Sequence, residues 1–250
     1  MTVIKWIGYG GVAVVAGLAA TIGVGHWSTE RDITAFQAQV KAIAHDAPQL
    51  GLDQAALSEL PDPVQRYFDF VFPNSVPAGD IVRLAAEGQF RRPQTEGFSF
   101  TTAEQVIALR EPALMFSATT PIIPGVWARA YDYFAEGEME MKAKILSVMT
   151  VVDESETPEL NVISLRRWLL ESALFPQGLL PGGPVTWEAI DDDCARAVGP
   201  AGDAQGLRLS TTHSSRLHMQ VTQLHRLRRC DRPSRRQSAS RKHAAHRRHV

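Results

Sequence analysis

The chain has 250 residues, of which 44% are hydrophobic and 21% charged, which suits one ordinary domain plus an appendage and excludes wholesale disorder. Its two cysteines exclude a disulfide framework and lack the paired spacing of a zinc site. The net charge of −1 conceals −12 over residues 1–205 and +11 over residues 206–250. Phosphate-loop, dinucleotide, HExxH and nucleophile-elbow motifs are absent. We therefore expect no cofactor or metal, and the sequence favours a protein that is not an enzyme.

The N-terminal segment predicts a membrane-spanning helix. Residues 6–25 carry no charged side chain, and 20 helical residues span about 30 Å, the thickness of a bilayer core. Lys5 precedes this run, so we expect a single pass of the cytoplasmic membrane with the N-terminus inside and the body outside, periplasmic or extracellular. A cleaved signal peptide is the alternative, although its apolar core is usually about 7–15 residues long.

A second helix is expected after the membrane segment. Ser28 or Thr29 can cap it, and it would run to about His45. One narrow apolar stripe lies along it, formed by Ile33, Phe36, Val40 and Ile43. The stripe either packs on the domain or pairs with a second copy of the chain. A row of small residues in the membrane segment would suit the same homodimer: Ala13, Gly17 and Thr21.

The segment LPDPVQRYFDFVFP, residues 60–73, predicts a short helix. Pro61 and Pro63 stand where a helix begins, and the apolar residues that follow share one face. Arg66 is the one residue here with candidate chemistry, as a partner for an anion. Its alternative role is that of an ordinary surface arginine.

Residues 81–198 predict an α+β body. Strand-like runs occupy 81–92, 98–109, 114–119, 126–134 and 138–145. The last run, EMEMKAKI, alternates apolar with charged residues, as a half-buried antiparallel strand does. Residues 153–156 read as an acidic turn, after which Thr157 caps a core helix reaching Phe175. A hairpin at 185–198 follows. We therefore predict one curved antiparallel sheet packed on that helix.

Four segments carry a family resemblance: LPDPVQRYFDFVFP, AEGEMEMKAKIL, LRRWLLESALFPQGLLP and VTWEAIDDDCARA. They resemble an uncharacterised bacterial family with L-P-x-P-V-x-R-Y and W-E-x-I-D-D motifs, over about residues 55–200. The resemblance implies a body like the curved half-barrels of lipoprotein carriers, by analogy of fold alone, and it supplies no activity. Family members continue with aromatic-rich strands, whereas this chain has no Phe, Trp or Tyr after Trp187. We therefore expect a fold that is incomplete at its C-terminus.

The basic end of the chain has three interpretations. Arg, Ser, His, Pro and Ala are what a GC-rich gene read out of frame encodes, so a frameshifted or truncated family member is the leading hypothesis. A genuine tail that binds anionic lipid or nucleic acid is the second, although a body outside the cell argues against nucleic acid. A solvated tail without a partner is the third. The chain is thus expected to comprise a membrane anchor (1–27), a linker helix (28–54), an α+β body (55–205) and a basic tail (206–250).

These features favour a membrane-anchored envelope protein that holds a lipid or another apolar ligand in its curved sheet. Methionine and tryptophan side chains suit irregular apolar ligands, and the candidate lining consists of Trp127, Met139, Met141, Trp168 and Trp187. The alternatives are a membrane-anchored hydrolase, with acids and Arg66 in one cleft, and a dimerising envelope scaffold. Expected partners are the bilayer, through residues 6–25, and an apolar ligand; no nucleic acid is expected.

Overall fold

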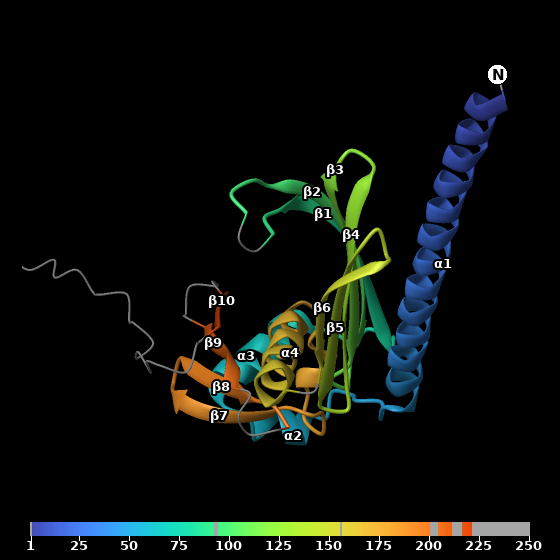
Figure 1. Cartoon of the computed structure of the whole chain (residues 1–250). Coiled ribbons are helices and arrows are strands. Elements are labelled where there is room, and N and C mark those ends of the chain that lie inside the picture. The colour runs from blue at the N-terminus through green and yellow to red at the C-terminus, as the bar shows by residue number, and fades with distance from the viewer. Residues whose placement is uncertain (1, 93–94, 156, 201–204, 212–216, 222–250) are drawn as a thin grey trace, which may run out of the picture.

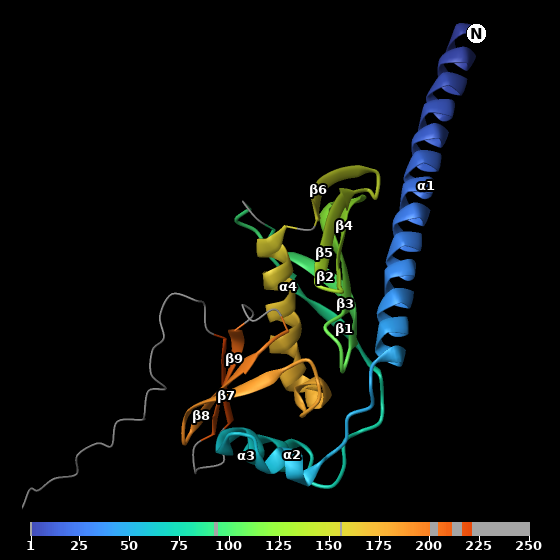
Figure 2. The same ribbon diagram turned by 90° about the horizontal axis from the view of Figure 1, so that it is seen from below.

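The computed structural model describes residues 2–92, 95–155, 157–200, 205–211 and 217–221, with side chains from Tyr9 to Pro200. Three layers make up its main part, as Figures 1 and 2 show: helix α1 (Thr2–Asp46), a six-stranded sheet, and helix α4 (Pro158–Glu171). Two short helices, α2 (Gln54–Ser58) and α3 (Asp62–Val71), lie at the end of the body away from the N-terminus. The prediction of an α+β fold with an N-terminal apolar helix is confirmed.

The six-stranded sheet is an antiparallel meander in which every strand pairs with its neighbour along the chain. Its strands are β1 (Ile81–Phe90), β2 (Ser99–Ala108), β3 (Leu114–Ile123), β4 (Val126–Ala135), β5 (Glu138–Ile145) and β6 (Met149–Ser155). The first five agree with the predicted runs. The acidic turn expected at 153–156 is wrong, because Asp153 and Glu154 lie in β6, an edge strand that is mostly exposed and so tolerates charged side chains.

A second sheet forms from the C-terminal strands, so the expectation of a single sheet is wrong. Strands β7 (Thr186–Asp191), β8 (Cys194–Val198), β9 (Gln205–Thr211) and β10 (Leu217–Val221) are antiparallel, in the order β10-β9-β8-β7. This sheet packs against α3 and α4. Most of β9 and all of β10 fall in the segment assigned to the basic tail, while 212–216 and 222–250 lie outside the described residues.

Helix α1 runs unbroken through the junction at which a second helix was expected to begin. Thr29 is not an N-cap, because its hydroxyl donates to the carbonyl oxygen of Gly25 one turn back (2.9 Å) and its side chain is buried. By length and composition α1 could cross a membrane, and none of its most apolar stretch is buried in the body. A signal sequence would share these properties.

The lower half of α1 packs on one face of the sheet, which we call the outer face. Ile33, Val40 and Ala44 of the helix are buried in one apolar cluster with Val106, Met115, Tyr131 and other residues of the sheet. The apolar stripe predicted on this helix therefore lies on its own domain. This packing removes most of the stripe from the surface that a second copy of the chain could use.

Helix α4 packs on the opposite, inner face, around which the sheet curves (Figure 1). Its start is as predicted: Thr157 is the N-cap, its side chain accepts from the backbone of Leu160, and Pro158 is the first helical residue. Trp168 of α4 is fully buried, and its indole nitrogen donates to the carbonyl oxygen of Ala108 (3.0 Å). The larger apolar core lies here, between the inner face, α3, α4 and the second sheet.

Candidate functional site

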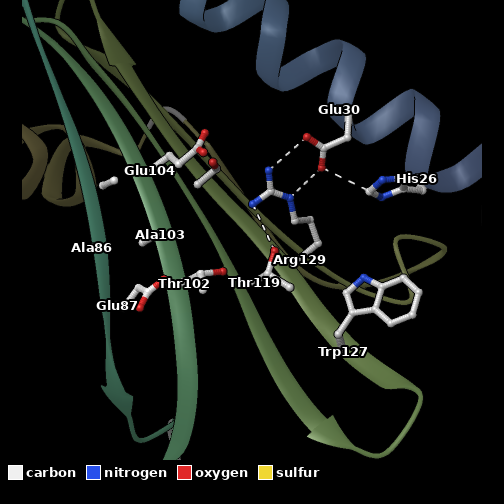
Figure 3. Close-up of a pocket in the computed structure, with 12 residues that line it drawn as sticks. His26, Glu30, Ala86, Glu87, Thr102, Ala103, Glu104, Thr119, Trp127 and Arg129 are labelled. Carbon is white, nitrogen blue, oxygen red and sulfur yellow. Dashed lines mark hydrogen bonds and ion pairs between the residues drawn. The ribbon is translucent and has the colours of Figure 1, made fainter.

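A pocket of about 560 Å³ lies between α1 and the outer face, and Figure 3 shows its polar lining. Its central feature is Arg129 of β4, which reaches Glu30 of α1. The guanidinium donates to both carboxylate oxygens, from Nε at 2.7 Å and from Nη2 at 3.1 Å. His26 lies 4.0 Å from the same carboxylate, and Thr119 accepts from Arg129 at 3.4 Å.

The Arg129–Glu30 pair clamps the helix to the sheet. Two parallel donor–acceptor contacts fix the relative orientation of the two planar groups, and only 13% of the Arg129 side chain is exposed. Lys144 of β5 adds a contact one strand away by donating to the Thr29 hydroxyl (3.2 Å). Both oxygens of Glu30 are engaged, so this carboxylate serves the packing of α1 better than it would serve acid–base chemistry.

A second polar cluster lies on the inner face beneath α4. Arg167 donates to Asp132 (3.1 Å), to Glu171 (3.0 Å) and to Gln105 (3.2 Å), and its guanidinium stands 4.7 Å from the ring centre of Phe116. Gln105 in turn donates to Glu171 (2.6 Å). Burial raises the pKa of Asp132 above its usual range, and the nearby Arg167 opposes that rise. The cluster thus joins α4 to β2 and β4.

Next to this cluster the inner face carries a row of very small side chains. Strand register places five alanines side by side across β1 to β5: Ala86, Ala103, Ala118, Ala130 and Ala143. Val152 of β6 completes the row. Helix α4 crosses the sheet to one side of it, since Asn161 bonds to Met139 of β5 and Glu171 bonds to Gln105 of β2. Only Ala118 in the row is buried.

The five residues predicted to line a ligand site are not all on one face. Met139 and Trp168 are buried in the larger core, and Met141 and Trp187 pack against its edge. Trp187 also donates to the carbonyl oxygen of Leu179 (3.0 Å). Trp127 lies on the outer face and lines the pocket of Figure 3. Whether any of these five side chains touches a ligand stays a prediction.

Arg66 of α3 lies beside the turn between β7 and β8. It donates to the carbonyl oxygen of Asp192 (2.9 Å), and its guanidinium lies 3.7 Å from the carboxylate of Asp193. These contacts connect α3 to the second sheet. The carboxyl whose pKa is raised beside an arginine is instead Asp132, next to Arg167. The anion-partner role of Arg66 stays a prediction.

Within the described residues, no group of three or more His, Cys, Asp or Glu side chains could hold a metal ion. The alanine row is the feature that sequence reasoning missed. Each alanine sits in a different strand, so the row exists only once the register of all five strands is known. The weak signal in the sequence is an alanine near the middle of every strand from β1 to β5.

Comparison with known proteins gives one match. A family model described as a family of unknown function (DUF6920) matches residues 58–240. The match runs past residue 200, at which the family resemblance was expected to end, and covers much of the basic segment. Searches of curated proteins and of solved structures found no match.

Proposed function

The chain belongs to the DUF6920 family of unknown function, and we propose that it is a membrane-anchored envelope protein that holds a lipid chain or another apolar ligand. The anchor is the apolar half of α1, which is long enough for a bilayer and whose most apolar stretch is not buried in the body. The ligand would lie on the inner face of the curved sheet, along the alanine row.

The alanine row is the observation that supports this ligand site. A methyl side chain fills little of the space above a sheet, so five in a line leave room where larger residues would fill it. The row is apolar and only partly covered, and it lies beyond the strip occupied by α4. A flexible alkyl chain fits a long, narrow apolar strip of this kind.

Polar groups border the row on both sides. On one side stands the Arg167 cluster with Asp132 and Gln105, and on the other the hydroxyls of Thr101 and Thr120 contact each other at 2.9 Å. Both sets are bonded within the protein. They would define the edges of an apolar strip, and a ligand with a polar end could meet them there.

The dimerising scaffold is weakened as an alternative. The main evidence for a dimer was the apolar stripe on the lower half of α1, and that stripe is packed against the sheet of the same chain. What remains for it is the row of Ala13, Gly17 and Thr21, three residues that are exposed on the apolar half of α1.

Native mass spectrometry of the full chain, released from nanodiscs in mild detergent, tests the ligand proposal. Ala130→Phe places a ring within the row, between Ala118 and Ala143. Ala38→Phe puts the same ring on an exposed face of α1 and is the matched control. We expect the wild type and the control to retain a phospholipid that Ala130→Phe loses at least tenfold. Equal retention by all three proteins, with unchanged melting temperatures, would refute ligand binding on the row.

Carbonate extraction of membranes, with detection of the N-terminal peptide, tests the anchor. An uncleaved anchor keeps the chain in the membrane pellet with residues 6–25 present. A soluble body that lacks this peptide would instead identify a cleaved signal sequence. Proteinase K added to spheroplasts then tests the orientation, because an external body is digested without lysis.

A further inference from the structure

We infer that the hairpin tips at one end of the six-stranded sheet form an apolar rim that inserts into the headgroup region of the bilayer crossed by α1. This inference rests on the membrane anchoring proposed above. It concerns a different surface from the alanine row, and it makes the body a lipid-contacting part of the protein rather than a domain held clear of the membrane.

The topology of the sheet gathers three connections at that end. In a meander, the turns β1–β2, β3–β4 and β5–β6 all lie at one end, and the turns β2–β3 and β4–β5 lie at the other. The rim consists of large apolar side chains that are 44–65% exposed: Phe90, Phe98, Phe100, Ile123, Val148 and Met149. Exposed apolar groups gathered at one edge mark a contact surface.

The opposite end of the same sheet has a different character. In the β2–β3 connection Leu109, Arg110 and Ala113 are buried, and the β4–β5 turn consists of Glu136 and Gly137. The two ends of the sheet therefore differ in the exposure of their apolar residues, and packing of the core does not explain this difference. Only the rim end leaves its apolar groups in water unless something covers them.

The position of the rim relative to α1 identifies what covers it. The β5–β6 turn packs against Gly25, the last residue of the charge-free run, so closely that a Cβ atom there would lie 2.6 Å from the carbonyl oxygen of Ser147. Glycine is thus required at the point where the apolar helix leaves the body. If residues 6–25 fill the bilayer core, this turn lies at the bilayer surface.

The β3–β4 tip reaches a similar height. Arg129 is bonded to Glu30, and four residues of strand separate Arg129 from Gly125 at the tip, or about 13 Å at full extension. The same rise along α1 is roughly nine residues, from Glu30 to Thr21. The tip therefore lies beside the last turns of the apolar run and points the same way as the free half of α1 (Figure 1).

The composition of the β3–β4 tip suits a lipid environment. Pro121 and Pro124 have no N–H group, which reduces the number of backbone donors left without water. An apolar pocket of about 560 Å³ lies at this tip, lined by Ser99, Phe100 and residues 121–127. Trp27, which is exposed on α1 just below the charge-free run, is of the type enriched at membrane interfaces.

Site-specific photocrosslinking of the full chain tests the rim. The protein would be placed in nanodiscs of phosphatidylcholine and phosphatidylglycerol whose acyl chains carry an alkyne near the glycerol. Benzoylphenylalanine would replace Ile123 at the rim, Val14 in the apolar helix, or Phe70 of α3. Phe70 is the matched control, because it is at least as exposed as Ile123 but belongs to α3, which lies at the far end of the body (Figure 1).

We expect lipid adducts at Ile123 within about threefold of those at Val14, and at least tenfold fewer at Phe70. Val148, a second rim position, would be labelled in the same way. If Val14 forms adducts while Ile123 and Val148 form no more than Phe70, the rim is overturned and the anchor still stands. Background adducts at Val14 would overturn the anchoring itself. Equal adducts at all positions, Phe70 included, would show unspecific lipid contact and would also overturn the rim.

Discussion

The lower half of α1 is held on the sheet by a few buried side chains. Substitution of Ile33 tests this packing most directly. Ile33 is 3% exposed and lies in the cluster with Val106, Met115 and Tyr131. Ile33→Ala removes three carbons, a loss of about 2.4 kcal/mol of transfer free energy at about 0.8 kcal/mol per carbon. The cavity left behind raises the cost to about 3 kcal/mol, within the range of about 2–5 kcal/mol for such changes.

Hydrogen exchange of the full chain in nanodiscs measures this cost locally. A change of about 3 kcal/mol in the opening free energy speeds exchange by on the order of a hundredfold, since each 1.36 kcal/mol is about tenfold. The acceleration should appear in peptides covering residues 29–46. Gln39→Ala, on the exposed face of the same helix, should change exchange less than threefold. Similar exchange rates in both variants would refute the idea that packing on the sheet protects residues 29–46 of α1 from exchange.

Three further predictions concern the core, the inner face and the tail. Gly178→Ala should lower the melting temperature by several degrees, because overpacking costs about 1–3 kcal/mol. The new Cβ would lie 2.5 Å from the carbonyl oxygen of Leu109 and 2.9 Å from the Trp168 ring. Gly97→Ala is the control and should leave the melting temperature unchanged, because the space around Gly97 is open. Burial raises the pKa of Asp132, so the native state holds its proton more tightly and the stability it contributes is lost as pH rises from about 4 through the raised value. Asp132→Asn should therefore gain melting temperature relative to wild type between pH 4 and pH 7, and parallel profiles would contradict this. Resequencing codons 195–215 tests the frame hypothesis, which requires an inserted or missing base; intact codons and a mass of 27.5 kDa would refute it.

Local patterns predicted most of the first sheet and the start of α4. The alternation in residues 138–145 follows from one wet and one dry face, and the Thr157-Pro158 cap acts within a single turn. Neither signal needs information from distant parts of the chain. The same locality explains two errors. Ser28 and Thr29 resemble a cap, but their neighbours on both sides are helical, and the acids of β6 resemble a turn although an edge strand accepts them.

The candidate sites depend on information that one segment does not contain. Strand alternation separates Trp127 from Met139 and Met141, because Trp127 shares the outer face with Arg129 while both methionines lie on the inner face. The Arg129–Glu30 clamp joins residues 99 positions apart. The alanine row likewise requires the register of five strands. Such features follow from topology, which the spacing of residues within each strand does not determine.

Because α1 is one continuous helix, the orientation of its apolar half is coupled to that of the body. Its 45 residues would extend about 68 Å as a straight helix, and the lower half is fastened to the sheet by Ile33, Val40 and the Arg129–Glu30 pair. Any rotation or tilt of the apolar half is therefore transmitted to the whole body without a hinge. If α1 crosses a membrane, a change in membrane thickness that alters the tilt of the helix would also turn the inner face, and a flexible glycine linker inserted after residue 28 would uncouple the two.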